Sequence, residues 1–357
     1  MNSEPLTKVL SHFELDDDIT PYGNGHINDT YVVNTNKIIL QRINTSIFPN
    51  PEKLMENINN VTKHIRKKIE LAGGDPDRET LTVVPTIDGK LFYEADKEHV
   101  YRAYTFVGGT KTIENDKTPE DLFEAGVGFG KFHNMLADFP ADSLYETIKD
   151  FHNTPKRVEA LKEAIEKNIA GRKDSVKEEI EFALENAKWA DVVVKGMEQG
   201  EIPVRVTHND TKINNILFDE ITGKAVCVID LDTVMPGSLL YDFGDALRMG
   251  SSTAAEDETD LDKVNFDEET FRAFSKGYLS EMKNSITERE LELLPFSIKL
   301  LTYECGIRFL TDYLNGDTYF KIHREHHNLD RARNQFKLVS DISKIEDRLN
   351  KVIKEII

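Results

Sequence analysis

Two short segments constrain this chain more than any other part of it: VTHNDTKINNILFD at residues 206–219 and VIDLDT at residues 228–233. Each joins an apolar run, which predicts a buried β-strand, to acidic and amide side chains that follow the strand. Asp and Asn are also common turn residues, so an ordinary surface turn is the alternative explanation for either segment alone. Together, and in this order, the two segments predict two strand ends that present polar groups to one site.

The polar residues at these strand ends match the needs of phosphoryl transfer. That reaction needs a carboxylate to orient the attacking hydroxyl, oxygen ligands for Mg²⁺, and positive charge near the phosphate. Asp210 is expected to be the catalytic base, and Lys212 to supply the charge. Asn215 and Asp230 are expected to bind Mg²⁺. The spacing from His208 onward is that of a kinase catalytic loop, in which the His is a packed structural residue, so we assign His208 no chemistry.

A glycine-containing segment near the N-terminus, YGNGH, supplies the candidate nucleotide site. Gly23 and Gly25 would let backbone amides approach phosphate oxygens, although an ordinary hairpin turn would explain them in isolation. Kinases usually carry a Lys on the third strand, but here Gln41 stands at that position and Arg42 is expected on the opposite face. Either Mg²⁺ and backbone amides hold the phosphates, or this register is wrong by one residue. We also place Tyr104 among the nucleotide-binding residues.

Secondary-structure signals divide the chain into two parts. The first hundred residues are strand-rich, with a helix expected from Asn50 to about Ile69, and the character changes to helix from Thr118 onward. We therefore predict an α+β protein with a nucleotide-binding lobe at residues 1–107 and a catalytic and acceptor-binding lobe at residues 108–357. The first lobe is expected to be small and mostly β, and the second large and mostly helical. Its strands are expected at 31–33, 38–40, 81–84, 91–93 and 100–104.

Several local features of the second part yield separate predictions. Ser175 and Glu178 have the spacing of a capping box at a helix start. Residues 251–263 are acidic and rich in Ala, Thr and Ser, which predicts a mobile, solvated loop. Apolar residues recur at alternating spacings of four and three from Leu338 to Ile356. That stripe permits a coiled coil, but we favour a helix docked on its own lobe. Asp242 is expected to brace the catalytic loop through hydrogen bonds.

Charge and cysteine content narrow the class of protein. The net charge of −19 argues against a nucleic-acid partner, yet an acidic enzyme can still bind ATP because Mg²⁺ and local cations offset the phosphate charge. The two cysteines, Cys227 and Cys305, lie in apolar runs, which predicts buried free thiols and excludes a disulfide framework. With neither an evident signal peptide nor an apolar run long enough to span a bilayer, we expect a soluble, cytoplasmic, monomeric protein without a membrane partner.

The motifs YGNGHINDTY, VTHNDTKINN, VIDLDT and GSLLYDFGD together resemble the aminoglycoside phosphotransferase and choline kinase-like superfamily. The similarity is closer to bacterial N-acetylhexosamine 1-kinases, through NTSIFP, MPGS, LLPFS and the stretch ECG-x-RFL-x-DYL-x-GD-x-YF. It covers the chain from Tyr22 to about Leu338. The resemblance implies a two-lobed protein-kinase-like fold with ATP and Mg²⁺. It also implies phosphorylation of the anomeric hydroxyl of N-acetylglucosamine or N-acetylgalactosamine.

The same resemblance implies roles for individual residues. Asp210 would be the base, Asn215 and Asp230 would bind Mg²⁺, and the substrate sugar would be held by His26, Arg308 and Tyr319, beside Asp210. Those kinases also carry Gln at the position of Gln41. The sequence itself bears on one of these roles. Arg308 lies in an otherwise apolar helical stretch, where a buried Arg needs partners such as sugar hydroxyls or, as the alternative, a structural salt bridge.

Two further functions remain open from the sequence. One is a kinase of another small alcohol, such as an aminoglycoside, choline or homoserine, and the negative charge of the chain would suit a cationic acceptor. The other is a kinase-like binding module that has lost activity, which the absence of a Lys at position 41 suggests. The chain retains the residues expected to perform catalysis and to bind the metal, which speaks against that second alternative: Asp210, Lys212, Asn215 and Asp230.

Overall fold

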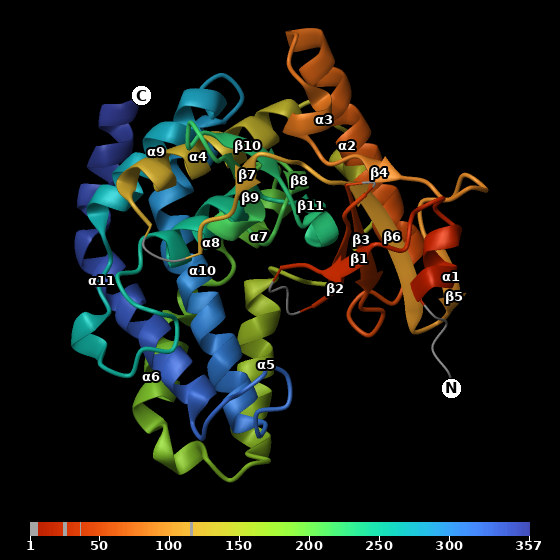
Figure 1. The fold of residues 1–357 in the computed structure, drawn as a ribbon. Coiled ribbons are helices and arrows are strands. Elements are labelled where there is room, and N and C mark those ends of the chain that lie inside the picture. Colours follow the sequence, from red (N-terminus) through yellow and green to blue (C-terminus); the bar gives the residue numbers. More distant parts are fainter. Residues whose placement is uncertain (1–5, 24–26, 36, 115–116) are drawn as a thin grey trace. The chain divides into compact units, whose positions relative to one another are not determined.

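The computed structural model describes residues 6–23, 27–35, 37–114 and 117–357 (Figure 1). It divides into two compact units, each built from separate stretches of chain. We call residues 1–112, 135–149 and 214–236 the strand unit, and residues 113–134, 150–213 and 237–357 the helical unit. The fold is kinase-like, with a small β-sheet region at the N-terminus and a helical C-terminal region, which confirms the predicted α+β class. The boundary between residues 107 and 108 stays a prediction.

An antiparallel sheet organises the strand unit. Its strands are β1 (Ile19–Pro21), β2 (Asp29–Val33), β3 (Ile38–Ile43), β6 (His99–Thr105) and β4 (Val83–Val84), in that spatial order, and β5 (Tyr93–Asp96) also pairs with β6. The predicted hairpin and the strand at 100–104 are therefore confirmed, whereas β4 spans only part of the expected 81–84, and the strand expected at 91–93 overlaps β5 only at Tyr93. The register places Gln41 of β3 opposite Thr30 of β2 on one side and opposite Arg102 of β6 on the other.

Helix α2 (Pro51–Ala72) forms where the sequence predicted it. The side chain of Asn50 caps the helix by accepting a hydrogen bond from the Lys53 amide, and Pro51 occupies the first turn, where no amide donor is needed. Asn57 on its buried face is hydrogen-bonded to the backbone of Tyr145 and to the carbonyl of Val234. These bonds tie α2 to the two other chain segments of the strand unit. The short helices α1 (Leu6–Ser11) and α3 (Pro76–Glu79) complete this region.

The two apolar runs that precede the reactive segments are strands, as predicted. β8 (Arg205–Thr207) precedes the catalytic loop, and β10 (Ala225–Val228) precedes Asp230. Within the strand unit, β10 pairs with β9 (Ile216–Asp219), which pairs in turn with β7 (Thr110–Lys111). The strand β11 (Met235–Gly237) follows.

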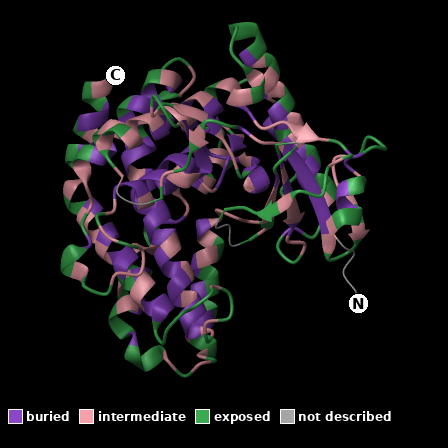
Figure 2. Cartoon of the chain, in the orientation of Figure 1, coloured by how far each residue is buried: buried purple, intermediate pink, exposed green. Residues whose placement is uncertain are grey.

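One long helix forms the centre of the helical unit. α10 (Glu288–Leu314) is buried along most of its length, and the helices α5, α8 and α11 contact it (Figures 1 and 2). A capping box of Thr287 and Glu290 starts α10. Its apolar side chains belong to one core cluster with those of α5, α6 and α11. The other helices of this unit are α4 (Pro119–Met135), α5 (Thr154–Lys167), α6 (Lys177–Glu185), α7 (Val192–Glu198), α8 (Leu239–Gly250), α9 (Glu268–Met282) and α11 (His327–Ile356).

Two local predictions for this unit are wrong, for physical reasons. The proposed capping box at Ser175 does not form, because Ser175 ends a 3-10 turn and its hydroxyl donates to the Arg172 carbonyl, so α6 begins later without a side-chain cap. The segment 251–263 is not simply solvated. Its carbonyl at Ala255 accepts a hydrogen bond from Asn334 of α11, and Glu256 forms an ion pair with Arg248 of α8. These contacts attach the segment to the helical core.

Other predictions for the described part of the chain hold. The apolar stripe of α11 docks on its own unit, since Leu338, Ile342, Leu349 and Val352 are buried. Both cysteines are free. None of the helices in the described ranges is both long and apolar enough to cross a membrane.

Helices α4 and α9 cross at unusually close range because glycines face each other's backbone. A Cβ atom added at Gly126 would lie 2.2 Å from the carbonyl oxygen of Phe274, and one at Gly277 would lie 2.0 Å from that of Phe123. Real Cβ atoms do not approach backbone this closely, so a larger residue at either position forces the helices apart.

We therefore expect Gly277→Ala to destabilise the protein by about 1–3 kcal/mol, the usual cost of overpacking. Thermal or denaturant unfolding would measure the change. The matched control is Lys276→Ala, which alters an exposed position on the same helix and should leave the unfolding free energy nearly unchanged. Equal stability of the two variants would show that the helices can separate without cost.

Candidate active site

The catalytic loop is held by the buried carboxylate of Asp242, at the start of α8. Its oxygens accept hydrogen bonds from the backbone amides of His208 at 2.6 Å and Asn209 at 2.7 Å. The hydroxyl of Thr211 donates to the Asp242 carbonyl. Asn209 has a φ of 64°, a left-handed conformation that Asn tolerates better than most residues. The predicted bracing role of Asp242 is confirmed by these bonds.

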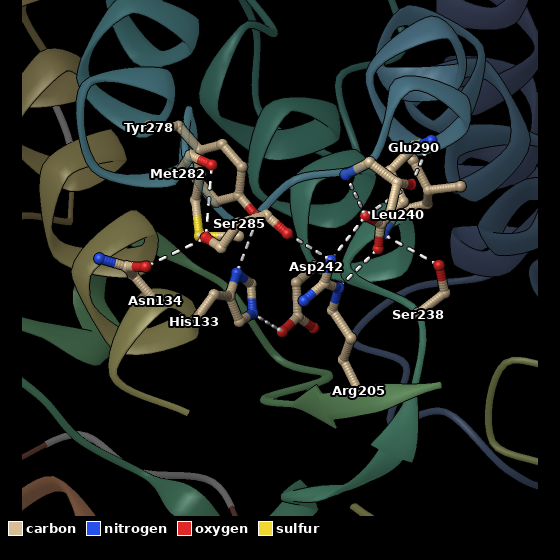
Figure 3. A network of polar contacts seen from close by, with 11 residues as sticks. His133, Asn134, Arg205, Ser238, Leu240, Asp242, Tyr278, Met282, Ser285 and Glu290 are labelled. Carbon is tan, nitrogen blue, oxygen red and sulfur yellow. Dashed lines mark hydrogen bonds and ion pairs between the residues drawn. The ribbon is translucent and has the colours of Figure 1, made fainter. Parts of the chain in front are cut away.

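A histidine on α4 extends this network (Figure 3). The Nε2 atom of His133 lies 2.7 Å from Asp242, and its Nδ1 atom lies 2.8 Å from the hydroxyl of Tyr278. A carboxylate only accepts hydrogen bonds, so Nε2 carries the proton and, in the neutral ring, Nδ1 accepts from Tyr278. His208 is fully buried with the edges of Phe129 and Phe132 against it, which agrees with a structural and not a chemical role.

The loop places Asp210 and Lys212 together. The Nζ atom of Lys212 lies 2.8 Å from Oδ1 of Asp210, and both side chains remain partly exposed. Burial lowers the pKa of Lys212, but the charge of Asp210 and its hydrogen bond outweigh this effect and raise the pKa above its ordinary value. Lys212 is therefore a cation beside the carboxylate of the predicted base. This geometry suits a group that orients a hydroxyl next to a source of positive charge.

The two predicted metal ligands come together within the strand unit. Asn215 ends a 3-10 turn, Asp230 follows β10, and the amide of Ile229 donates to the carbonyl of Asn215 at 2.9 Å, which joins the two segments. A carboxylate and an amide oxygen are the hard donors that Mg²⁺ prefers, so this pair fits the ion. Among the residues that the structure describes, no group of three His, Cys, Asp or Glu could hold a metal. A Mg²⁺ site in which nucleotide phosphates and water complete the coordination typically has only one or two protein ligands.

Arg102 is a polar residue of this site that was not predicted from the sequence. It is fully buried in the middle of β6, with Nη1 2.5 Å from Oδ1 of Asp232 and Nε donating to Oε1 of Gln41 at 3.0 Å. Burial lowers the pKa of Arg102, but the nearby carboxylate outweighs this and raises it. The available signal was an Arg within the strand sequence HVYRAYT. The centroid of the Tyr104 ring, which is also buried, lies 5.2 Å from this guanidinium.

Of the other residues predicted for the nucleotide side, some lie in the described part of the chain and some do not. Gly23 has a φ of 74°, a left-handed conformation that suits glycine, and a Cβ there would meet nothing within 4 Å. Gly25 and His26 lie outside the described residues. Gln41 and Arg42 do lie on opposite faces of β3, because Gln41 bonds Thr30 and Arg102 whereas the Nε atom of Arg42 donates to Asp29.

In the helical unit, Arg308 of α10 lies between two aromatic rings. The centre of its guanidinium is 5.9 Å from the ring centroid of Phe151 and 5.5 Å from that of Phe320. Ring contacts of this kind occupy the faces of a guanidinium, while its N–H groups point outward in the plane. Within the described ranges, none of these N–H groups is hydrogen-bonded to the protein. The structural salt bridge that the sequence left open therefore does not occupy them.

Further charged groups surround Arg308. One turn earlier on α10, the buried Glu304 contacts His152 at 2.8 Å and accepts from the hydroxyl of Thr154. Burial raises the pKa of Glu304, but His152 and Arg308 lower it more, so it stays ionised. Burial lowers the pKa of Arg157, and the positive charge of Arg308 lowers it further. Glu304, Tyr319 and Asp150 act on the pKa of Arg157 in the opposite direction.

Tyr319 follows α10, on a segment that Asp312 fixes. The carboxylate of Asp312 accepts the backbone amides of Thr318, Tyr319 and Phe320 at 2.8–2.9 Å. The side chain of Tyr319 is largely exposed, and its ring contacts the ring of Phe320, which itself stacks on Arg308. Arg308 and Tyr319 are therefore connected through Phe320. Sequence analysis missed Asp312, which the DYL motif of this region contained.

This fold and these sites define the class of protein as a kinase-like phosphotransferase. Residues 18–279 match the model of the phosphotransferase enzyme family, and since the match covers more than half of the chain, the chain belongs to that family. The structure is similar to a microcompartment-associated aminopropanol kinase, with 16% identity, a TM-score of 0.63, and coverage of 97% of this chain and 98% of that one.

Two other solved structures share this fold. An aminoglycoside phosphotransferase from Alicyclobacillus acidocaldarius is 14% identical with a TM-score of 0.64, over 99% of this chain and 98% of that one. An amicoumacin kinase in complex with AMP-PNP, Ca²⁺ and Ami is 13% identical with a TM-score of 0.59, over 96% and 92% of the two chains.

Replacing Asp242 tests whether the catalytic loop depends on its carboxylate. Asp242→Asn exchanges one acceptor oxygen for an N–H donor that faces the loop amides, so we expect a loss of about 1.5–3 kcal/mol of stability. We also expect a lower kcat with little change in KM for ATP, because the loop shifts while the strand unit is untouched. Unfolding curves and steady-state kinetics would measure both. Asp347→Asn, at an exposed position on α11, is the control.

Proposed function

We propose that this phosphotransferase moves the γ-phosphoryl group of ATP to the anomeric hydroxyl of an N-acetylhexosamine, giving the sugar 1-phosphate. N-acetylglucosamine and N-acetylgalactosamine are the proposed acceptors. The observation that carries this proposal is the guanidinium of Arg308, which is stacked between Phe151 and Phe320 with N–H donors available to a ligand rich in oxygen. A hexosamine offers several hydroxyls and an acetamido carbonyl as acceptors for these donors.

The guanidinium of Arg308 carries a permanent positive charge, which disfavours an ammonium group directly against it and so favours a neutral acceptor at this position. The second candidate function is nevertheless a kinase of an amine-bearing alcohol. The net charge of −19 favours it, as does the similarity of this fold to an aminopropanol kinase and an aminoglycoside phosphotransferase.

The chemistry assigns one role to each catalytic group. Asp210 would accept the proton of the attacking hydroxyl, and an anomeric hydroxyl is more acidic than an ordinary alcohol, so a carboxylate is a better-matched base for it. Lys212 would face the phosphoryl group during transfer. Asn215 and Asp230 would hold Mg²⁺, which neutralises phosphate charge when bound.

The remaining assignments concern binding. The nucleotide is assigned to the lobe of residues 1–107 and the acceptor to the lobe of residues 108–357, with His26 of the first lobe added to the acceptor site. The amicoumacin kinase structure contains AMP-PNP and Ca²⁺, which supports a nucleotide and a divalent cation for this fold. Gly23, Gly25, Gln41 and Tyr104 are proposed on the nucleotide side, and His26, Arg308 and Tyr319 on the sugar side.

The proposed function is tested directly by a substrate panel. Protein, ATP and Mg²⁺ are incubated with N-acetylglucosamine, N-acetylgalactosamine, choline, homoserine and an aminoglycoside while ADP release is followed. The product is then examined by phosphorus NMR, in which coupling to the anomeric proton identifies a 1-phosphate. A 6-phosphate signal, or good turnover of an amine with none of either hexosamine, would overturn the proposal. ADP release with none of the acceptors would favour a module without kinase activity.

Asp210→Asn should nearly abolish turnover while leaving ATP binding intact. The amide cannot take the proton of the acceptor hydroxyl, and loss of a positioned base typically costs about 10²–10⁴-fold in rate. Turnover is measured by ADP release and ATP binding by calorimetry, with Asp347→Asn as the control. A variant that keeps more than about a tenth of the wild-type kcat would be incompatible with this role, since it lies outside that range.

Arg308→Ala should raise KM for the hexosamine and leave KM for ATP nearly unchanged. Loss of a hydrogen bond from a charged group costs about 1.5–3 kcal/mol, which corresponds to roughly 10–150-fold in KM. The matched control is Arg289→Ala, on the same helix but exposed and paired with Glu292. Equal effects of Arg308→Ala on the two KM values would place Arg308 outside the acceptor site.

A further inference from the structure

We propose that Arg102 is a positioning residue that replaces the usual third-strand Lys of kinases. It supplies a cation from β6 instead of β3, and it acts on the metal-binding turn and not on the phosphates. The inference rests on the proposed role of Asp230 as a ligand of Mg²⁺. The residue at position 41 of β3 explains why the positive charge is carried by β6 and not by β3.

Gln41 is a partner of Arg102 in this structure. Its Oε1 atom accepts from Nε of Arg102 at 3.0 Å, and its Nε2 atom donates to the hydroxyl of Thr30 at 3.1 Å. A Lys side chain has three donors and no acceptor, so it could not accept the Nε–H of Arg102. It would also place a second cation beside a buried guanidinium. The absence of a Lys at position 41 is thus explained by the presence of an Arg at position 102.

Arg102 in turn engages the turn that carries Asp230. Its Nη1 atom lies 2.5 Å from Oδ1 of Asp232, and Nδ2 of Asn28 donates to Oδ2 of Asp232 at 2.7 Å. Oδ2 of Asp232 thus accepts a hydrogen bond from Asn28, and Oδ1 forms an ion pair with Arg102 without hydrogen-bond geometry. A carboxylate at this position could be an additional metal ligand or a group that orders the turn, and these contacts support the second role.

The same contacts support an otherwise costly backbone. Asp230 has a φ of 59° and a ψ of 57°, and a left-handed conformation at a residue other than glycine persists only when surrounding structure enforces it. Asn28 contributes to this support, because its Oδ1 atom accepts the backbone amide of Asn44 at the end of β3. One chain of contacts therefore runs from Thr30 through Gln41, Arg102 and Asp232 to Asn28, and its central pair, Arg102 and Asp232, is buried.

Burial makes the pairing of Arg102 obligatory. Its side chain is 1% exposed and that of Asp232 is 5% exposed, so neither charge is solvated by water. Removing one partner of such a pair leaves an uncompensated buried charge, which is far more disruptive than loss of a surface pair. The turn at residues 230–232 is thereby fixed before any nucleotide binds, so that the Asp230 carboxylate is preorganised.

The test compares Arg102→Met, Arg102→Lys, Asp232→Asn and Gln41→Lys with the control Arg42→Met. Arg42 is the neighbouring cation of β3, on the opposite face, exposed, and paired with Asp29. The readouts are the Mg²⁺ concentration for half-maximal activity, the KM values for ATP and acceptor, and thermal unfolding. Binding of Mn²⁺ in the presence of AMP-PNP, measured by electron paramagnetic resonance, requires no acceptor and no turnover.

We expect Arg102→Met to weaken Mg²⁺ and Mn²⁺ binding by about 10–100-fold, the usual effect of losing a group that orients a metal ligand. KM for the acceptor should change little. Arg102→Lys should recover part of the loss, because an ammonium still pairs with Asp232. Gln41→Lys and Asp232→Asn should weaken metal binding in the same direction, and Arg42→Met should resemble the wild type.

Unchanged Mn²⁺ binding by a folded Arg102→Met protein would overturn the inference. So would an Arg102→Lys protein that binds Mn²⁺ no more tightly than Arg102→Met does. If Arg102→Met does not fold, Gln41→Lys decides, because it keeps Asp232 as the partner of Arg102 while it removes the acceptor for Nε and adds a cation beside the guanidinium. Wild-type metal binding in that variant contradicts the inference. Failure of the proposed function is distinguishable, since the wild-type protein would then lack turnover of hexosamines while Mn²⁺ and AMP-PNP binding still reports on Arg102.

Discussion

A carboxylate without access to water must have its oxygens satisfied by the protein, and this requirement shapes the loops of both units. Asp242 accepts two amides of the catalytic loop, and Asp312 accepts three amides of the segment that carries Tyr319. Asp232 takes contacts from Arg102 and Asn28 at the turn that carries Asp230. In each case a buried Asp orders a neighbouring segment, and that segment carries a functional group that is exposed or partly exposed.

This division of roles separates the groups that do chemistry from the groups that position them. Asp210, the proposed base, is partly exposed and lies beside Lys212, whereas Asp242 has hardly any exposed surface. Substitutions at the buried residues should therefore act through loop geometry and stability, and substitutions at exposed ones through turnover. The family shown by residues 18–279 accounts for phosphotransfer, while the proposed acceptor rests on the surroundings of Arg308.

Features set by neighbouring residues could be predicted from the sequence. The hairpin of β2 and β3 and the start of α2 at Asn50 follow from local apolar periodicity and from capping chemistry. The opposite orientation of Gln41 and Arg42 follows from the period of a strand. The bracing by Asp242 was predicted as a hydrogen-bonding role for this carboxylate, and its bonds to the amides of His208 and Asn209 confirm it.

Features set by distant residues could not be predicted. Arg102 and Asp232 are far apart in sequence, and the ion pair exists only because the sheet places β6 beside β3 and near the turn after β10. Likewise, the attachment of Glu256 and its neighbours depends on partners in α8 and α11 that composition does not reveal. Ser175 shows the opposite failure: a correct local motif was displaced by a competing local hydrogen bond.

The residues Glu304, Arg308 and Asp312 on α10 recur at intervals of four, so they lie along one side of the helix, about 6 Å apart along its axis. Each organises a different piece of chain: Thr154 and His152, then the rings of Phe151 and Phe320, then the amides that follow the helix. Inserting or deleting a single residue between them would rotate the later members by about 100° around the axis. This part of the chain can therefore diverge by substitution, but a change in its length would take the contacts on the two sides of the change out of register with each other.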